Sequence, residues 1–309
     1  MLQYNCFSMF YNRITMSYNC YYMATEKQEN LNNILIPNQE RLDSLIQKFK
    51  EQGKNKVHIL ADFDRTLTKA IVEGQKAPTV IAQIRQSEYL TSDYASKAHE
   101  LYDKYHSIEI DPKVNKQEKI AKMHEWWQKH FALLVSSGLN KKVMDEIVSK
   151  RTLKFRVGAL DFIDSLHKNN IPLVIMSAGP GDMISQYLKQ EARLYNDIHI
   201  IANFFEFDKN SKVIKVKEPI IHSLNKKEIF VKDFPAFSDV KERKNVILLG
   251  DGVDDIDMIE GFAYDNLIKI GFLNENVEEN LPEFKKNFEV IIENDGDMEF
   301  VNNLMEEII

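Results

Sequence analysis

Two aspartates that stand one residue apart, Asp62 and Asp64, could do acid, base or metal chemistry together. They come directly after Val57–Ala61, a short β-branched and apolar run that predicts a strand. In an open α/β sheet, ligands bind beyond the carboxyl ends of the strands, so both residues would lie in the binding crevice. One carboxylate could then bind a metal while the other handles a proton. Because an isolated Asp-x-Asp is more often a solvated strand end, this chemistry needs support from residues elsewhere.

Polar residues also follow two further predicted strands. Residues 172–176 form an apolar run that leads into Ser-Ala-Gly at 177–179, where small residues would let backbone amides approach an anion. Residues 245–249 form a continuous apolar run, typical of a strand buried on both faces, and lead to Asp251 and Asp255. Since the carboxyl ends of parallel strands meet at one edge of a sheet, these residues would lie near the Asp-x-Asp pair.

This combination of residue types suggests phosphoryl transfer. Clustered carboxylates repel one another unless a hard cation is bound, and oxygen ligands suit Mg²⁺. A phosphate ester would add a second anion, for which Ser177 could supply a hydrogen-bond donor and Lys226 a positive charge. A carboxylate nucleophile would divide one difficult displacement into two easier steps.

Further apolar patterns predict the elements that would position these residues. Apolar residues at 42, 45, 46 and 49 predict an amphipathic helix that ends near Gly53. Strands are predicted at 198–202, 267–270 and 289–292, and a hairpin at 204–207 and 213–216. Strands that alternate with helical patterns predict an α/β core with a parallel sheet.

Between the first and second predicted strands the pattern is helical, which predicts an all-helical insertion. Within it, Asn115 and Glu118 match a capping box that opens a helix, and Gly138 would end that helix. Such an insertion would form a cap that closes over the crevice and excludes water.

These patterns together predict the domain organisation. Residues 31–69 and 171–309 would form the catalytic core, and residues 70–170 the helical cap. Residues 1–22 contain no acidic residue and lack the basic start and apolar centre of a secretory signal. We expect residues 1–30 to be a disordered extension.

The composition argues against several classes of protein. With 309 residues the chain can bury a large core, and 40 Lys and Arg against 47 Asp and Glu give a net charge of −7. This acidity argues against a nucleic acid polymer as partner, and no apolar run is long enough to span a membrane. The two cysteines, Cys6 and Cys20, fit a reducing, cytoplasmic compartment better than a disulfide framework. We expect a monomer.

Four motifs, in this order, resemble those of the haloacid-dehalogenase superfamily of phosphohydrolases. They are Asp62-Phe63-Asp64-Arg65-Thr66, Ser177-Ala178-Gly179, Lys226 and Gly250-Asp251-Gly252-Val253-Asp254-Asp255. More narrowly, the chain resembles the cytosolic type III 5′-nucleotidases, which act on pyrimidine and 7-methylguanosine monophosphates. The supporting stretches are 105–112, 125–127, 171–182, 221–226 and 267–274. The resemblance covers residues 42–309 and implies a Rossmann-like parallel-sheet core with an all-helical cap inserted after the first strand.

The resemblance also implies a mechanism and a magnesium cofactor. Asp62 would attack phosphorus to form an aspartyl-phosphate, and Asp64 would protonate the leaving nucleoside 5′ oxygen and then activate water. Mg²⁺ would be held by the Asp62 carboxylate, the Asp64 main-chain oxygen and Asp251, while Asp255 would support its water shell.

The resemblance also implies five residues that bind the substrate, a nucleoside 5′-monophosphate. Ser177, the Ala178 amide and Lys226 would hold the phosphoryl oxygens. Glu109 in the cap would accept hydrogen bonds from an amino group of the base, and Trp127 would stack on the base. Because 7-methylguanine is cationic, stacking on Trp gains a cation–π term of about 0.5–2 kcal/mol. We therefore expect hydrolysis of 7-methylguanosine monophosphate and CMP, with UMP as a further candidate.

Three departures from the family pattern leave the substrate preference open. Arg65 replaces the commoner Met of the first motif, and Gly252-Val253-Asp254 replaces the usual Ser-x-Gly. His130 stands near the expected base position, where it would narrow the pocket or add a contact; a surface position for this residue is the alternative.

Other functions also stay open. A pyrimidine-only 5′-nucleotidase or phosphotransferase would use the same residues. A sugar phosphatase or phosphomutase shares the core, although a sugar needs neither Glu109 nor an aromatic platform such as Trp127. A non-enzymatic phospho-accepting receiver module also uses clustered acids, a Ser or Thr and a Lys, but the long helical insertion would have no purpose there.

Overall fold

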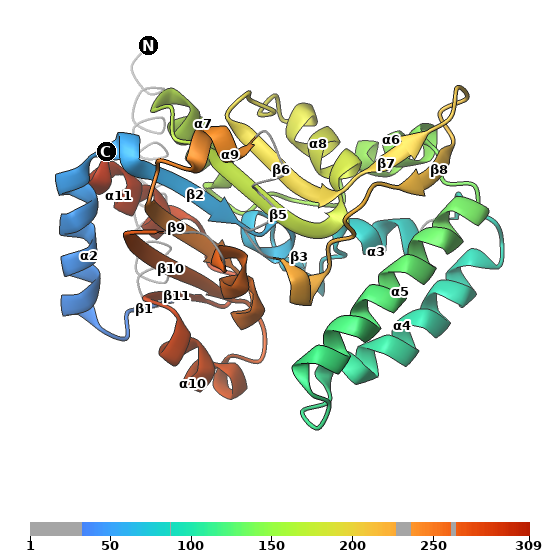
Figure 1. Ribbon diagram of the computed structural model, residues 1–309, viewed down its shortest axis with the longest axis horizontal. Helices are drawn as coiled ribbons and strands as arrows, with labels where there is room; N and C mark the ends of the chain where they lie inside the picture. The colour runs from blue at the N-terminus through green and yellow to red at the C-terminus, as the bar shows by residue number, and fades with distance from the viewer. Residues whose placement is uncertain (1–32, 87, 227–235, 261–263) are drawn as a thin grey trace, which may run out of the picture.

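A parallel sheet with helices on both faces forms the centre of the molecule (Figure 1). The computed structural model describes residues 33–86, 88–226, 236–260 and 264–309. Within these residues, the sheet has seven strands in the order β1-β11-β10-β9-β2-β5-β6. The strands are β1 (Ile34–Leu35), β2 (Val57–Ala61), β5 (Leu173–Pro180), β6 (Ile198–Asn203), β9 (Asn245–Gly250), β10 (Asn266–Leu273) and β11 (Val290–Glu293).

The position of β2 decides where the site can form. It lies between β9 and β5 and is parallel to both, with Ala61 opposite Leu249 and Ile175. The strand β1 is antiparallel to β11, whereas the other neighbouring strands are parallel. Residues that follow β2, β5 and β9 therefore meet at one edge, as the sequence predicted.

Both faces of the sheet are apolar, because helices or packed loops cover each of them. Ile59 and Ile247 belong to the larger hydrophobic cluster on one face, and Leu60 and Leu248 to a second cluster on the other. The first face is covered by α2 (Gln39–Gln52), α7 (Ala159–Lys168), α8 (Gly181–Gln190) and α11 (Glu299–Ile308). The second is covered by α9 (Ala236–Val240) and by the turn Val253–Ile259, and α10 (Val277–Asn287) packs on β10 and β11. This burial explains the continuous apolar runs in the sequence.

Helices occupy most of the chain between β2 and β5. They are α3 (Val80–Arg85), α4 (Tyr94–Ile110), α5 (Lys116–Ser136), α6 (Lys141–Ser149) and α7. Figure 1 shows α4 and α5 side by side, projecting away from the sheet, whereas α7 packs against α11. The same stretch contains a short hairpin, β3 (Ile71–Val72) and β4 (Gln75–Lys76), which the sequence pattern does not predict. The domain boundaries proposed from the sequence stay a prediction.

Local sequence explains where α5 begins and ends. The Asn115 side chain accepts a hydrogen bond from the Glu118 N–H at 3.0 Å, as predicted for the start of this helix. After the last turn the backbone passes through Gly138 at φ 87°, a conformation that glycine adopts without strain. The helix then packs on β8 (Val213–Val216), which forms the predicted hairpin with β7 (Phe205–Phe207).

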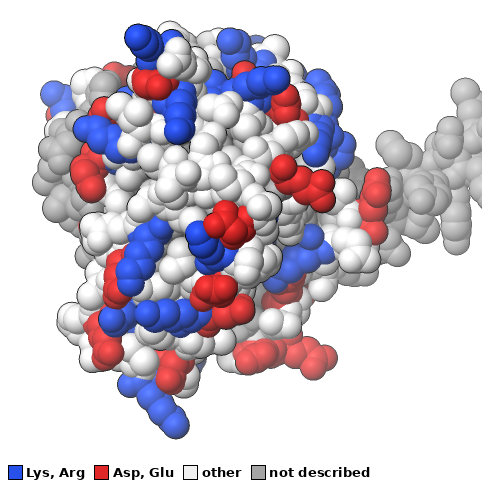
Figure 2. Space-filling model, turned by 90° about the vertical axis from the view of Figure 1, so that its right-hand side faces the viewer, with Lys and Arg blue, Asp and Glu red and all other residues white. Residues whose placement is uncertain are grey.

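The face formed by α4, α5 and this hairpin shows Lys and Arg interspersed with Asp and Glu around an area that bears no charge (Figure 2). Among the described residues, none of the helices combines the length and the apolar character that crossing a membrane would require. The predicted extension, residues 1–30, lies outside the described residues.

Candidate active site

The turn that follows β2 places both sequence-predicted aspartates at the carboxyl edge of the sheet. The Asp62 N–H donates to the Leu249 carbonyl at 3.0 Å, which extends the pairing of β2 with β9 by one residue. Phe63 is fully buried and meets the Phe155 ring edge-on, with 6.0 Å between the ring centroids. Phe63 therefore anchors the turn, and Asp62 and Asp64 flank this anchor.

Lys226 lies between two of the predicted carboxylates. Its ammonium donates to Asp62 Oδ1 and lies 3.2 Å from Asp255 Oδ1. All three side chains are buried. Burial opposes the charge of Lys226, but Asp255 and Asp62 outweigh it and raise the pKa of this lysine. The side chain is therefore a fixed cation at neutral pH.

Asp255 also shapes the loop after β9. Its Oδ2 accepts hydrogen bonds from the Asp251 N–H at 3.0 Å and the Gly252 N–H at 3.1 Å. Gly250 allows this close approach, because a Cβ atom there would lie 2.5 Å from the Cβ of Asp255. With both oxygens engaged, Asp255 holds the loop and Lys226 in place, and the Asp251 carboxylate is free to bind a ligand.

The site holds more negative charge than Lys226 can balance. Oxygens of Asp62, Asp251 and Asp255 all lie within 4.8 Å of one another. Burial, reinforced by Asp255, raises the pKa of Asp251 to about 7, and burial also raises that of Asp62 despite the nearby Lys226. Buried carboxylates behave in this way when a positive charge is missing. An oxygen-rich, hard cluster of this kind fits a divalent cation such as Mg²⁺.

Asp64 has a different environment from Asp62. Its Oδ1 accepts a hydrogen bond from the Val80 N–H, the first residue of α3, at 2.9 Å. Burial raises its pKa to about 6, although the Val80 hydrogen bond acts in the opposite direction. A carboxyl group with such a pKa can both give and take a proton near neutrality.

The end of β5 lies beside Asp64. Ser177 is buried, and its Oγ accepts a hydrogen bond from the Gly179 N–H at 3.0 Å. A Cβ atom on Gly179 would lie 3.3 Å from Ser177 Oγ and 3.6 Å from Asp64 Oδ2, so these two groups adjoin the same backbone. The carbonyl of Ala178 accepts from the Asn203 side chain at 2.7 Å, which fixes the peptide that follows Ser177.

Glu109, near the end of α4, reaches the core through a hydrogen bond. Its Oε1 accepts from Ser223 Oγ at 2.8 Å, and Ser223 precedes Lys226 by three residues. His106 lies 3.2 Å from the other oxygen. The structure therefore places Glu109 next to the segment that positions Lys226.

The two tryptophans of α5 have different neighbours. Trp126 stacks on Tyr105 of α4 at 6.1 Å, with 7° between the planes, and so packs between the two helices. Trp127 is half-buried and its ring contacts Phe131 at 5.3 Å and His130 at 6.2 Å. The structure brings six predicted core residues together as one group: Asp62, Asp64, Ser177, Lys226, Asp251 and Asp255. It places Trp127 on α5, beside Phe131 and His130.

His130 is not on the surface. It is 5% exposed and hydrogen-bonded through Nε2 to the Tyr94 hydroxyl at 3.1 Å. Burial, together with Arg85, lowers its pKa to about 4, so the ring is neutral at physiological pH. The structure therefore excludes the surface position, and a place for His130 near the base stays a prediction.

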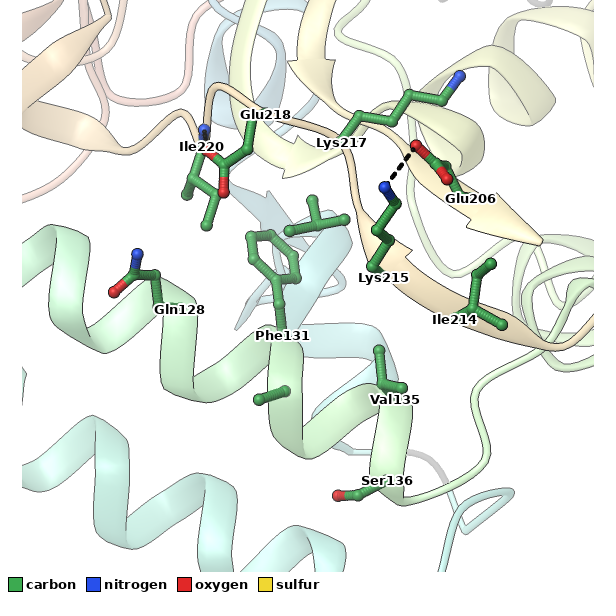
Figure 3. A pocket seen from close by; sticks show the side chains of 12 residues that line it. Gln128, Phe131, Val135, Ser136, Glu206, Ile214, Lys215, Lys217, Glu218 and Ile220 are labelled. Carbon is green, nitrogen blue, oxygen red and sulfur yellow. Dashed lines mark hydrogen bonds and ion pairs between the residues drawn. The ribbon is translucent and has the colours of Figure 1, made fainter. Parts of the chain in front are cut away.

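A cavity of about 860 Å³ lies elsewhere, between α5 and β8 (Figure 3). Phe131 and Val135 of α5 face Ile214, Lys215 and Lys217 across it. None of the sequence-predicted site residues lines it. This cavity is therefore separate from the place where the acids gather.

Asn203 is a site residue that the sequence reasoning missed. Besides the Ala178 carbonyl, its side chain binds both the carbonyl and the N–H of Ile221, at 2.8 and 2.9 Å. It thereby joins the end of β5 to the segment that leads to Lys226. A polar residue directly after a predicted strand was the signal that could have identified it. The Val80 contact left no such signal, because a backbone group makes it.

Comparisons with known proteins agree with this geometry. A family model described as pyrimidine 5′-nucleotidase (UMPH-1) matches residues 65–309. The 7-methylguanosine phosphate-specific 5′-nucleotidase of Gallus gallus is 32% identical over 288 residues, which cover 93% of this chain and 99% of that protein. The protein with the same description from Mus musculus is 31% identical over 277 residues, covering 89% and 92% of the two chains.

Solved structures show the same fold. The crystal structure of cytosolic 5′-nucleotidase IIIB bound to cytidine has a TM-score of 0.83 and 28% identity, covering 89% of this chain and 93% of that one. A HAD family hydrolase from Salmonella enterica has a TM-score of 0.50 at 17% identity, over 81% and 71% of the two chains. These matches confirm the predicted α/β haloacid-dehalogenase fold.

Proposed function

The chain belongs to the pyrimidine 5′-nucleotidase (UMPH-1) family, and we propose on that premise that it hydrolyses nucleoside 5′-monophosphates to nucleoside and phosphate. The observation that supports this best is the buried contact of Lys226 with Asp62 and Asp255, with Asp251 and Asp64 alongside. Such a site offers a nucleophile, a proton donor and charges for a phosphate, and these are the needs of phosphoryl transfer.

In the proposed reaction, Asp62 is the nucleophile and Asp64 the acid and base. A carboxylate oxygen of Asp62 forms a bond to phosphorus as the bond from phosphorus to the 5′ oxygen breaks, and Asp64 gives its proton to that oxygen. Asp64 then takes a proton from a water molecule that attacks the aspartyl-phosphate. Phosphate leaves, and the Asp62 carboxylate is restored.

The remaining core residues would bind the phosphoryl group and a cation. Ser177, the Ala178 amide and Lys226 supply donors and a positive charge for the phosphoryl oxygens. The Asp62 carboxylate, the Asp64 main-chain oxygen and Asp251 would hold Mg²⁺, and Asp255 would support its water shell. The cation would neutralise charge that develops on the phosphoryl group.

The cap residues Glu109 and Trp127 would select the base. Glu109 would accept from an amino group of cytosine or of a guanine, and Trp127 would stack on the ring, with the extra cation–π term for 7-methylguanine. Relatives named as 7-methylguanosine phosphate-specific and a relative solved with cytidine support both classes of base, with UMP as a further candidate. A pyrimidine-only nucleotidase or phosphotransferase is the alternative.

The relatives and the fold also support proposals about location, oligomeric state and domain organisation. The description of the solved relative as cytosolic supports a cytoplasmic location. We further propose a monomer that acts on small molecules, with residues 31–69 and 171–309 as the core and 70–170 as the cap. The projection of α4 and α5 from the sheet supports this division.

Steady-state phosphate release tests the proposal. The 5′-monophosphates of cytidine, uridine, adenosine, guanosine and 7-methylguanosine are compared, with Mg²⁺ and with a chelator, for the parent protein and Asp62→Asn. We expect Mg²⁺-dependent turnover that Asp62→Asn lowers by at least about 10³-fold, since the nucleophile is lost. Turnover of sugar phosphates alone would point to a sugar phosphatase, and no turnover of any ester to a receiver module.

A further inference from the structure

A buried arginine distant in sequence holds the turn that bears Asp64. The Arg156 side chain is fully buried, and its guanidinium donates to the carbonyls of Arg65 and Thr66, the latter at 2.8 Å. It also lies 3.4 Å from the carbonyl of Thr68. A guanidinium presents its donors in a planar fork, so one side chain can bind several carbonyls of a tight turn.

The turn needs such support because of its backbone. Arg65 adopts φ 63° and ψ 2°, a left-handed conformation that is unfavourable for a residue with a side chain. Its carbonyl accepts from Arg156 and also from the Asn274 side chain at 3.0 Å. Asn274 in turn accepts from Arg156 at 3.0 Å. The carbonyl next to Asp64 is thus fixed by two side chains that come from outside the turn.

Arg156 is held by groups from the opposite end of the chain. Asp295 provides the counter-charge at 3.1 Å, and the Phe272 ring lies 4.2 Å from the guanidinium carbon. Burial lowers the pKa of Arg156 to about 10, although Asp295 acts in the opposite direction, and the group stays charged at neutral pH. A charged guanidinium is costly to bury unless partners satisfy it. The partners named above therefore fix the position of Arg156.

The same acid fixes the backbone that leaves the turn. Asp295 accepts from the N–H groups of Ala70 at 2.8 Å and Ile71 at 3.1 Å. This departing segment pairs with the returning one, since Thr68 and Phe155 form an antiparallel bridge. Arg156 and Asp295 therefore lie where the chain leaves the core for α3–α6 and comes back.

From this arrangement we infer that Arg156, backed by Asp295, is a positioning residue that holds the Asp64 turn in its reactive shape. It touches no reacting atom in the proposed mechanism, on which this inference rests. Its effect is to set where the Asp64 carboxyl lies relative to the leaving oxygen.

The dependence of kcat/KM on the leaving group tests this role of Arg156. A nucleotide needs the proton of Asp64 on its 5′ oxygen, whereas the 4-nitrophenolate of 4-nitrophenyl phosphate leaves without one. In Arg156→Met we expect kcat/KM for CMP to fall about 10²-fold, since small misplacements of a catalytic group have such effects. The value for 4-nitrophenyl phosphate should fall less than about threefold. Arg156→Lys, which keeps the charge but not the fork, should lie between parent and Arg156→Met for CMP.

Arg243 offers a matched control at the other end of β2. Its guanidinium donates to the carbonyls of Val57 and Asn170, each at 3.1 Å, and it also lies partly buried. Arg243→Met should lower the melting temperature while both kcat/KM values stay near those of the parent. Circular dichroism and melting temperature are measured for every variant.

Equal losses for both substrates in folded Arg156 variants would show a loss of active protein and overturn the inference, and so would unchanged rates. If Arg156→Met does not fold, Arg156→Lys and the near-isosteric Asp295→Asn are judged by the same two substrates. The proposed function fails separately, because in that case the parent itself turns over no nucleotide.

Discussion

At the level of single residues, the buried site has more negative than positive charge. Lys226 supplies one positive charge to Asp62 and Asp255, and Asp251 lies close to both. Among the described residues, no hydrogen-bond donor reaches the Asp251 carboxylate, and burial raises its pKa to about 7. A bound cation would remove this imbalance, whereas without one a proton has to do so at neutral pH.

A pH-dependent stability follows from the raised pKa values. Burial raises the pKa of Asp64 to about 6 and that of Asp251 to about 7, from an ordinary value of 3.8. Both carboxyls bind a proton more tightly in the folded protein than in the unfolded chain. Their effect on stability is therefore favourable at low pH and is lost as pH rises from about 4 to about 7. We predict that the melting temperature of the metal-free protein falls between pH 5 and pH 8, and falls less in Asp251→Asn.

Two controls make this measurement specific. The exposed Asp145, replaced by Asn, should leave the pH dependence as in the parent. Mg²⁺ should raise the melting temperature of the parent at pH 8, by mass action, and should have little effect on Asp251→Asn. The same pH dependence in Asp251→Asn and the parent would contradict the assignment of this effect to Asp251.

At the scale of elements, hydrogen bonds of the Asn203 side chain join the end of β5 to the segment before Lys226. Its side chain satisfies the carbonyls of Ala178 and Ile221 and the N–H of Ile221. We predict that Asn203→Leu, which leaves these buried groups without partners, lowers the free energy of unfolding by about 3 kcal/mol. Activity should also fall by at least about tenfold, because the Ala178 amide and Lys226 lose their common support.

Asn266→Leu is the control for Asn203→Leu. It is buried at the opposite end of the sheet, where its side chain donates to Asn245 at 2.8 Å. Asn266→Leu should also destabilise the protein, as urea unfolding would show, while kcat of the folded fraction stays at the parent value. If both variants lose activity in proportion to their stability, Asn203 has no specific link to the site.

Elements of the sheet were predictable from the sequence for a physical reason. Strands buried on both faces must be apolar throughout, so 172–176 and 245–249 were recognised by pattern alone. The stretches 198–202, 267–270 and 289–292 each contain one polar or charged residue and were recognised as mostly apolar runs. The polar residues after them located the core of the candidate site, since parallel strands end at one edge. Boundaries were less accurate: β5 continues through the Ser-Ala-Gly stretch to Pro180, where it pairs with Asn203.

Features that depend on distant partners were not predictable. The two-residue β1 has no pattern of its own and exists because it pairs with β11, where Ile34 lies opposite Ile292 and Leu35 opposite Ile291. The left-handed backbone of Arg65 and its contact with Arg156, 91 positions away, likewise arise from the assembled fold. Glu109 was expected near a base, yet its hydrogen bond with Ser223 joins elements whose arrangement no local pattern encodes.

At the scale of the whole molecule, the helices α4 and α5 meet the core through two apolar contacts. The first is part of the large hydrophobic cluster and contains Tyr94 and Ala98 of α4 and Phe131 and Leu134 of α5. The second is smaller and lies at the segment before Lys226. Leu224 packs with Tyr105 and Met123, which are fully buried. An exposed ion pair, Lys116 with Asp257 at 2.7 Å, lies beside this contact. Exposed ion pairs contribute about 0–1 kcal/mol, and a buried Met contributes several times more. The apolar contacts should therefore dominate the docking of these helices, with Met123 a main part of the smaller one.

The greater weight of the apolar contacts over the ion pair predicts how substrate affinity responds to salt and to mutation. In the proposed complex the nucleotide lies between α5 and the core. Its binding would need these two parts docked, so weaker docking should raise KM. We predict that Met123→Ala raises KM for CMP by about tenfold or more, whereas Lys116→Ser changes it by less than about threefold. For the same reason KM of the parent should change little between about 0.05 and 0.5 M KCl, because salt screens exposed charges but not apolar contacts. A KM that rises steeply with salt, or a larger effect from Lys116→Ser than from Met123→Ala, would contradict this prediction. Either result would indicate that charged contacts such as Lys116 with Asp257 dominate the docking of these helices.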